Sequence, residues 1–112
     1  MRQWLVNPKI LCRQHLLGEH CEHHMFVGSI NKNISVAGYL RDNLLEIPSL
    51  QRRHEELKEE MLRRGMNHNS DLPEVNCEGL DLSIKIDKEE ALKELLRRCP
   101  ECKRRYEENG IN

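Results

Sequence analysis

Acidic and imidazole side chains recur at helical spacing near the start of the chain. If residues from about 8 to 28 form a helix of about 100° per residue, His15, Glu19 and Glu22 lie on one arc. Leu11, Cys12 and Phe26 share that arc, and Arg13, His20 and His24 lie opposite. Carboxylates beside apolar residues are costly unless they are paired or solvated. We therefore expect this arc either to pair its acids or to face a solvated cleft.

A second group of residues has the spacing of metal ligands. Cys99 and Cys102 form a Cys-x-x-Cys pair, and the first helix offers further candidate ligands in His20, Cys21, His23 and His24. A second Cys-x-x-Cys pair is absent, so a closed zinc site needs ligands that the fold brings together. We expect no bound metal and no cofactor. In that case Cys99 is a buried thiol and Cys102 a partly exposed one.

Composition limits the class of protein. A chain of 112 residues with 38% hydrophobic residues predicts one domain, residues 1–112, with a small core. The net charge of -1 is low for a nucleic-acid binder, but three basic clusters can act locally. These are residues 52–53, residues 63–64, and residues 97–98 with 103–105.

Cysteine usage and hydropathy indicate the cellular setting. The five cysteines are an odd number, no apolar signal segment opens the sequence, and no apolar run has the length of a membrane span. We expect an intracellular protein in a reducing setting, without a membrane partner.

The remaining patterns predict an all-α fold, a compact single-domain helical bundle with one extended segment near residues 80–86. Helices are expected from about 8 to 28 after an Asn7 cap, near 36–42, over 49–65, and after an Asp87 cap until Pro100 breaks or kinks the chain. Residues 28–33 read as a turn, and residues 66–79 as a polar loop. Residues 80–86 alternate with period two, but no second strand candidate pairs with them, so we expect an extended segment lying on the helices.

Three stretches of the sequence resemble the pyrimidine-dimer DNA glycosylase family, which includes the phage dimer-specific endonuclease. They are RQHLLGEHCEHH at residues 13–24, Gly28 at the expected distance after it, and LQRRHEELKEEMLRRGMNH at residues 50–68. In order and spacing, the resemblance covers residues 1 to about 75. The last third is only loosely similar.

The resemblance implies a DNA-repair glycosylase with associated AP-lyase activity. Its substrate is double-stranded DNA with a damaged pyrimidine, bent so that a base flips out. The family's nucleophile is the α-amine of the mature N-terminus, and a Glu on the first helix assists it. Aligned through His15 and Glu22, the nucleophile falls on Met1, the neighbouring arginine on Arg2, and the catalytic acid on Glu22.

These groups suit the implied reaction. An amine attacks C1′ of deoxyribose only when neutral, and α-amines have a pKa of about 7.7–8.0, far below that of lysine side chains. Glu22 would stabilise positive charge on the sugar and shuttle the proton lost from C2′. Lys85 or another lysine is an alternative nucleophile. The expected substrate-binding residues are Arg2, His15, Glu19, Arg52, Arg53 and His54.

Some expected contacts have specific roles. His15 lies two turns before Glu22, where it could position that acid or touch a phosphate. Arg52 and Arg53 lie near the start of their helix, which makes them better DNA contacts than the later arginines. His54 could position substrate or bond back to the first helix.

The chain also departs from the phage pattern. Phage-type members expose a Thr after Met removal, whereas Arg2 here disfavours removal of Met1. Cys21 and Met25 replace the two arginines that flank the catalytic acid, and the aromatic basic tail is reduced to Tyr106 among charges. These changes affect dimer specificity more than the chemistry.

Two other functions fit parts of the sequence. A non-catalytic member of the same fold would bind nucleic acid or protein without cleaving DNA. A small zinc-binding adaptor would be built on Cys99, Cys102 and the histidine cluster at residues 20–24. At single residues, Glu22 could be an ordinary helix carboxylate, and His15 and His54 could be satisfied core histidines.

Overall fold

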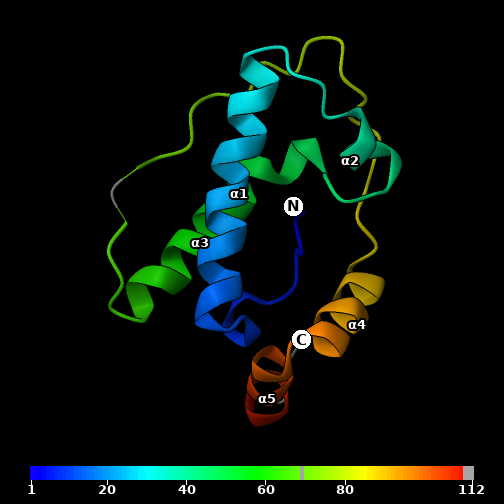
Figure 1. Cartoon of the computed structure of the whole chain (residues 1–112). Coiled ribbons are helices and arrows are strands. Elements are labelled where there is room, and N and C mark those ends of the chain that lie inside the picture. Colours follow the sequence, from blue (N-terminus) through cyan, green and yellow to red (C-terminus); the bar gives the residue numbers. More distant parts are fainter. Residues whose placement is uncertain (69, 110–112) are drawn as a thin grey trace.

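Helices form the framework of residues 1–68 and 70–109, the part of the chain that the computed structural model describes. In chain order they are η1 (Pro8–Ile10), α1 (Arg13–Asn31), α2 (Ala37–Arg41), η2 (Ile47–Ser49), α3 (Leu50–Arg63), α4 (Lys88–Arg98) and α5 (Pro100–Asn109) (Figure 1). Within these residues no strand is formed, so the predicted all-α class is confirmed. No helix in this part of the chain combines the length and apolar character that crossing a membrane requires.

The first predicted helix was wrong at both ends. Asn7 does cap a helix, accepting a hydrogen bond from the amide of Lys9 at 3.0 Å, but that helix is the single turn η1. The chain then extends through Leu11, and Cys12 caps α1 by accepting from the amide of His15. The break lets Leu11 enter the core, where it is fully buried. At the other end α1 continues past Gly28 to Asn31, and Ile30 is buried on this last turn.

α1 packs against α3, and the two helices divide the interior into two apolar clusters. One surrounds the N-terminal segment, α1 and the later helices, with Trp4, Leu16, Leu57, Ile86 and Leu95 among its buried members. The other lies beneath α2 and η2, with Phe26, Val27, Leu45, Leu50 and Leu72. Leu50, Leu57 and Met61 recur at helical spacing on one face of α3, and all three are buried.

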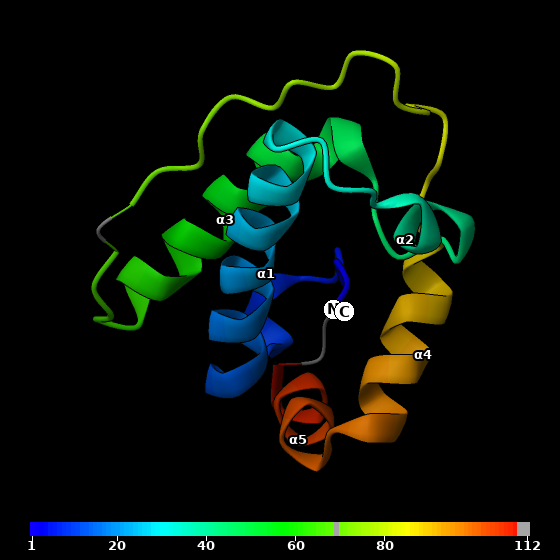
Figure 2. The same ribbon diagram turned by 45° about the horizontal axis from the view of Figure 1, so that its top comes forward.

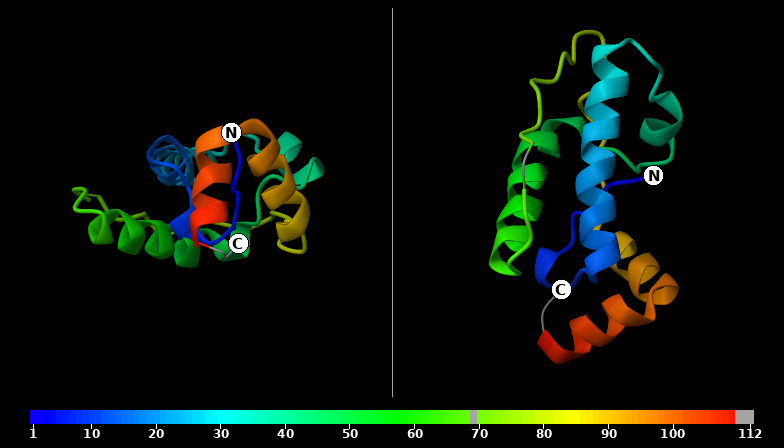
Figure 3. Two further views of the ribbon diagram at one scale, coloured as in Figure 1. Left: turned by 90° about the horizontal axis from the view of Figure 1, so that it is seen from below. Right: turned by 60° about the vertical axis from the view of Figure 1, so that its left-hand side comes forward.

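Residues 1–7 run between α1 and α4 (Figures 1 and 3); residues 3–6 are buried, and Met1 is exposed. Gln3 is fully buried and holds this segment: its backbone amide donates to the carbonyl of Leu44 at 2.9 Å. Its side chain accepts from the amide of Glu46 at 2.6 Å and contacts Nε2 of His23 at 3.0 Å. Buried polar groups must be paired in this way. The start of the chain is therefore fixed by the core.

A buried ion pair joins three parts of the fold. Arg53 on α3 donates to both carboxylate oxygens of Glu19 on α1, at 2.7 and 2.9 Å, and to the carbonyl of Val6 at 2.7 Å. The side chains of Arg53 and Glu19 are 1% and 0% exposed. Leu5, next to Val6, has φ of 55°, a left-handed conformation that costs a branched residue free energy. The bond to Val6 helps to hold the chain in that conformation.

The described residues between α3 and α4, 64–68 and 70–87, form no helix and run along the outside of the molecule (Figure 2). Gly65, with φ of 78°, ends α3 as predicted. The predicted extended segment near residues 80–86 is also observed: the amide of Ile86 donates to the Glu46 carboxylate at 3.1 Å, and Asn43 donates to the carbonyl of Lys85.

The last two helices close the lower end of the molecule in Figure 1. Asp87 caps α4, as predicted, by accepting from the amides of Glu89 and Glu90. Pro100 ends that helix, but the basic tail after it is helical as α5, with Pro in the first turn where no amide is needed. α5 packs against η1, and Arg105 donates to the carbonyl of Lys9 at 2.8 Å.

We expect Arg53→Ala to lower the free energy of unfolding by about 3–5 kcal/mol, because it leaves the Glu19 carboxylate buried without a partner. The matched control is Arg52→Ala at the neighbouring exposed position, which should change it by less than about 0.5 kcal/mol. Urea denaturation followed by circular dichroism measures both. Equal stabilities of the two variants would contradict this role of Arg53.

Candidate active site

A cleft of about 260 Å³ opens beside the N-terminal residue. Three parts of the chain line it: residues 1–4, one face of α1 and the end of α4. The lining residues are Met1, Arg2, Trp4, Gln14, His15, Gly18, Glu19, Glu22 and Arg98. Five of the eight predicted site residues, namely Met1, Arg2, His15, Glu19 and Glu22, therefore line one cleft, and Arg98 joins them from a distant helix.

Glu22 is the free acid of this cleft. It is half-buried, and burial raises the pKa of its carboxyl group above the ordinary value. Hydrogen bonding from the Arg2 backbone, the positive amine of Met1 and the Arg2 guanidinium oppose that shift. The amine is thus near enough to act on the carboxylate, although the two do not form a direct ion pair within 4.0 Å. A carboxyl group with a raised pKa exchanges protons more readily near neutral pH.

Trp4 organises the cations of the cleft. The Arg2 guanidinium lies 4.1 Å from the centre of its ring, and that of Arg98 lies at 5.6 Å. His15 meets the same ring edge-on, with ring centres 6.0 Å apart. Stacking on an indole fixes a guanidinium without neutralising it. The cleft therefore presents two guanidinium groups beside Glu22, and that of Arg98 also pairs with Glu94 at 2.7 Å.

Sequence reasoning did not single out Trp4 or Arg98 as site residues. Trp4 carried one usable signal, since it is the only Trp and lies close to Met1. Arg98 carried none, because its place in the cleft depends on how α4 folds back toward the N-terminal segment. It was visible only as part of a basic cluster.

Glu19 and Arg53 bind each other and do not present free groups to the cleft. Both Glu19 oxygens accept from the guanidinium, which also bonds Val6 and Glu56. Of the two outcomes expected for the acids of the first helix, pairing or exposure to a solvated cleft, Glu19 shows pairing. We leave both residues out of the substrate contacts proposed below.

Arg52 lines a different and larger cavity of about 550 Å³, between residues 5–9 and α3. Glu56, Glu59 and Glu60 line the same cavity. Lys9, Arg63 and Lys88 line it as well, so its acidic and basic side chains largely offset one another and its size alone does not make it a DNA-binding site. Arg52 and the candidate active site lie apart.

His54 belongs to a cluster of four histidines on the side of α1 away from the cleft: His20, His24, His54 and His68. His20 and His24, both on α1, therefore face α3. Nε2 of His54 lies 3.2 Å from Nε2 of His24 and 3.4 Å from that of His68, which lies 2.8 Å from that of His20. The predicted bond from His54 to the first helix is therefore present. Each neutral Nε2 either donates one hydrogen or accepts, so alternating tautomers satisfy two of these three contacts, and Nδ1 of His54 is buried without a hydrogen-bond partner among the described residues.

Two groups of side chains are of the kind that hold metal ions: His20, His54 and His68 in this cluster, and Cys12, His15, Cys99 and Cys102 at the start of α1. The structure thus gives Cys99 and Cys102 two partners that the sequence did not indicate. Cys102 is fully buried and Cys99 is partly exposed, the reverse of the expectation.

Fold and cleft together define a small helical protein whose N-terminal residue shares a site with an acid and two arginines. The chain belongs to the pyrimidine dimer DNA glycosylase family, whose family model matches residues 1–74. It is accordingly a DNA-repair glycosylase of that family, and its substrate is DNA with damaged pyrimidines. No curated protein and no solved structure matched the chain. The family match ends before α4, so Arg98, Cys99 and Cys102 lie outside it.

The histidine cluster predicts a pH-dependent stability. Burial and the neighbouring histidines lower the pKa of His20 and of His54 to about 4. Below about pH 6.5 the unfolded chain takes up protons at these residues while the folded chain does not. The free energy of unfolding should therefore fall, by about 1–3 kcal/mol, between about pH 6.5 and about pH 4.

Urea denaturation across this pH range measures the effect, with His20→Gln as the comparison. Gln does not titrate, so the variant should lose less stability as the pH falls. If the variant and the unchanged protein follow the same pH dependence, the cluster is not its source.

Proposed function

We propose that the protein cleaves damaged DNA as a glycosylase with AP-lyase activity, using the α-amine of Met1 as nucleophile and Glu22 as the acid–base group. The observation that carries this proposal is the shared cleft, in which Met1 and Glu22 lie together and the amine acts electrostatically on the carboxylate. The family match supports a glycosylase. The lyase step and the imine are our own inference.

The proposed reaction begins when the neutral amine attacks C1′ of the damaged nucleotide. The bond from C1′ to the base breaks, and the base leaves with its electron pair and takes up a proton. Loss of the ring oxygen from C1′ then gives a protonated imine between Met1 and the opened sugar. Removal of a C2′ proton expels the 3′ phosphate, which breaks the strand, and water releases Met1 from the product.

Glu22 serves two steps of this sequence. As a carboxylate it stabilises the positive charge that develops at C1′, and it then accepts the C2′ proton. Its half-buried position suits both tasks, because a desolvated carboxylate interacts more strongly with a nearby positive charge and its pKa is raised.

We assign DNA binding in the cleft to Arg2 and Arg98. Their guanidinium groups stack on Trp4 beside Glu22, where they can contact the phosphates next to the lesion. A cleft of about 260 Å³ holds a sugar but not a duplex, so the damaged nucleotide must leave the stack of double-stranded DNA to reach Met1. A DNA substrate also agrees with an intracellular protein.

Borohydride trapping tests the nucleophile. We expect reduction during turnover of a duplex with an abasic site or a pyrimidine dimer to link DNA covalently to the chain, because borohydride reduces an imine to a stable amine. Peptide mass spectrometry should place the adduct on Met1, and intact mass should show that its amine is free. Lys85→Arg is the control and should trap equally well.

An adduct on Lys85 or another lysine would overturn the assignment to Met1. DNA binding without any adduct or strand cleavage would favour the non-catalytic alternative.

Glu22→Gln should slow strand cleavage of the same DNA duplex, measured without borohydride, by roughly 10²–10⁴-fold, which is the usual contribution of a general acid or base. Unchanged cleavage by this variant would remove Glu22 from the mechanism.

Arg98→Gln should weaken binding to abasic duplex several-fold and lower the slope of log K against log salt concentration by about 1, because one phosphate contact is lost. The matched control is Arg97→Gln. Arg97 is also exposed and also pairs with Glu94, but it lies outside the cleft. Fluorescence anisotropy over a salt series measures both variants. The same slope in the two would contradict the assignment of Arg98.

A further inference from the structure

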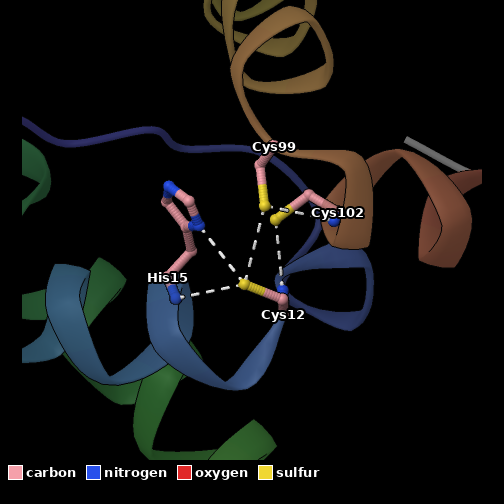
Figure 4. Close-up of side chains that lie close together, drawn as sticks. All are labelled: Cys12, His15, Cys99 and Cys102. Atoms are coloured by element: carbon pink, nitrogen blue, oxygen red, sulfur yellow. Dashed lines mark hydrogen bonds between the residues drawn. The ribbon is translucent and has the colours of Figure 1, made fainter.

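Cys12, His15, Cys99 and Cys102 meet where the start of α1 faces the junction of α4 and α5 (Figure 4). Cys12 caps α1 and His15 lies in its first turn, whereas Cys99 and Cys102 lie almost ninety positions later in the chain. One candidate ligand atom from each residue lies within 4.8 Å of all the others. Four such groups rarely converge unless something holds them together, and neither pair alone makes a closed site.

All three sulfurs accept hydrogen bonds from backbone amides. The amide of His15 donates to Sγ of Cys12 at 3.4 Å, and the amide of Cys102 donates to Sγ of Cys99 at 3.4 Å. The amide of Cys12 donates to Sγ of Cys102 at 3.2 Å. Neutral thiols are weak acceptors, whereas thiolates are strong ones. The backbone thus offers an amide donor to each of the three sulfurs, a contact that is stronger to a thiolate than to a thiol.

The distances within the cluster fit a zinc ion, which would also offset the repulsion between three thiolates placed this close together. Zn–S bonds of about 2.3 Å in a tetrahedron place two sulfurs about 3.8 Å apart. Sγ of Cys12 and Sγ of Cys99 are separated by 3.8 Å. Sγ of Cys12 and Nδ1 of His15 are 3.3 Å apart, close to the corresponding sulfur–nitrogen edge of about 3.5 Å.

We propose that Cys12, His15, Cys99 and Cys102 bind one Zn²⁺ in a structural site. Thiolate and imidazole ligands select zinc over the oxygen-preferring cations Mg²⁺ and Ca²⁺. Four protein ligands leave no position for water or substrate, so the ion is not catalytic. A disulfide is the competing use of these cysteines. It would pair two sulfurs and leave the third cysteine and His15 without a role.

The proposed ion would cross-link the start of α1 to the junction of α4 and α5, in addition to the packing of α5 against η1. Cys102 is the one side chain of α5 that is buried among residues 100–109, so the helix has little apolar packing of its own. The metal would hold α5 against η1 and fix Arg98, the residue before Cys99, at the cleft. Ligation through Nδ1 would also fix the tautomer of His15, leaving its other ring nitrogen protonated at the cleft wall.

Metal content tests the site without any DNA substrate, so this proposal and the glycosylase proposal can fail separately. We expect one zinc per chain, by elemental analysis, after expression with zinc and dialysis. Cys99→Ser and Cys12→Ser should each lose most of the bound zinc. The matched controls are Cys21→Ser and Cys77→Ser, at cysteines outside the cluster, which should keep it.

Cobalt substitution identifies the ligands and separates this site from the histidine cluster. Co²⁺ bound by thiolates gives intense near-ultraviolet charge-transfer bands, which a site made only of histidines does not give. The unchanged protein and His20→Gln should show these bands, and Cys99→Ser should show them weakened.

Chelation provides a measurement that does not depend on a variant folding. Removal of the zinc should lower the thermal unfolding temperature of the unchanged protein, and zinc should restore it. A protein without zinc, a metal with no thiolate bands, or a Cys99–Cys102 disulfide in the freshly purified protein would each overturn the proposal.

Discussion

The position of the N-terminal segment depends on one buried guanidinium. Arg53 reaches from α3 to the Glu19 carboxylate and to the carbonyl of Val6, and so it joins two helices and the segment that carries Met1. A buried charge of this kind has no alternative partner in the interior, which makes its geometry specific. The arrangement also separates the two acids of α1: Glu19 is used for structure, and Glu22, one turn later, remains free for chemistry. The conformation of Leu5 is one cost of leading the chain through this position.

An N-terminal amine is usually too mobile to be a precise reagent, but here buried residues anchor the chain directly after Met1 and Arg2. Residues 3–6 are all buried, and Gln3 is bonded to the loop before η2 and to His23. Met1 is therefore separated from the buried Gln3 by a single residue. Trp4, on the same segment, orders the two arginines beside it. The proposed nucleophile, its acid and its phosphate contacts would thus be positioned by one short stretch of chain.

Local signals in the sequence predicted most helices, because capping and apolar spacing act over a few residues. Asp87, Gly65 and Pro100 each mark a helix end where expected. The predicted start of the first helix was wrong because the chain breaks the helix at Leu11, whose side chain is buried in the core. Pairwise contacts between distant segments were the other limit. Arg53 looked like a surface residue, and nothing near Cys99 indicated Cys12. The resemblance to a family supplied Met1 and Glu22, which no helical pattern could have joined.

The stacking of Arg2 on Trp4 gives the molecule a built-in optical signal. The chain contains a single Trp, so all indole emission comes from the wall of the cleft. Guanidinium groups and an imidazole lie within a few ångströms of that ring and influence its excited state. Intrinsic fluorescence therefore monitors the occupancy and the electrostatic surroundings of one defined place, without any dye attached to the protein.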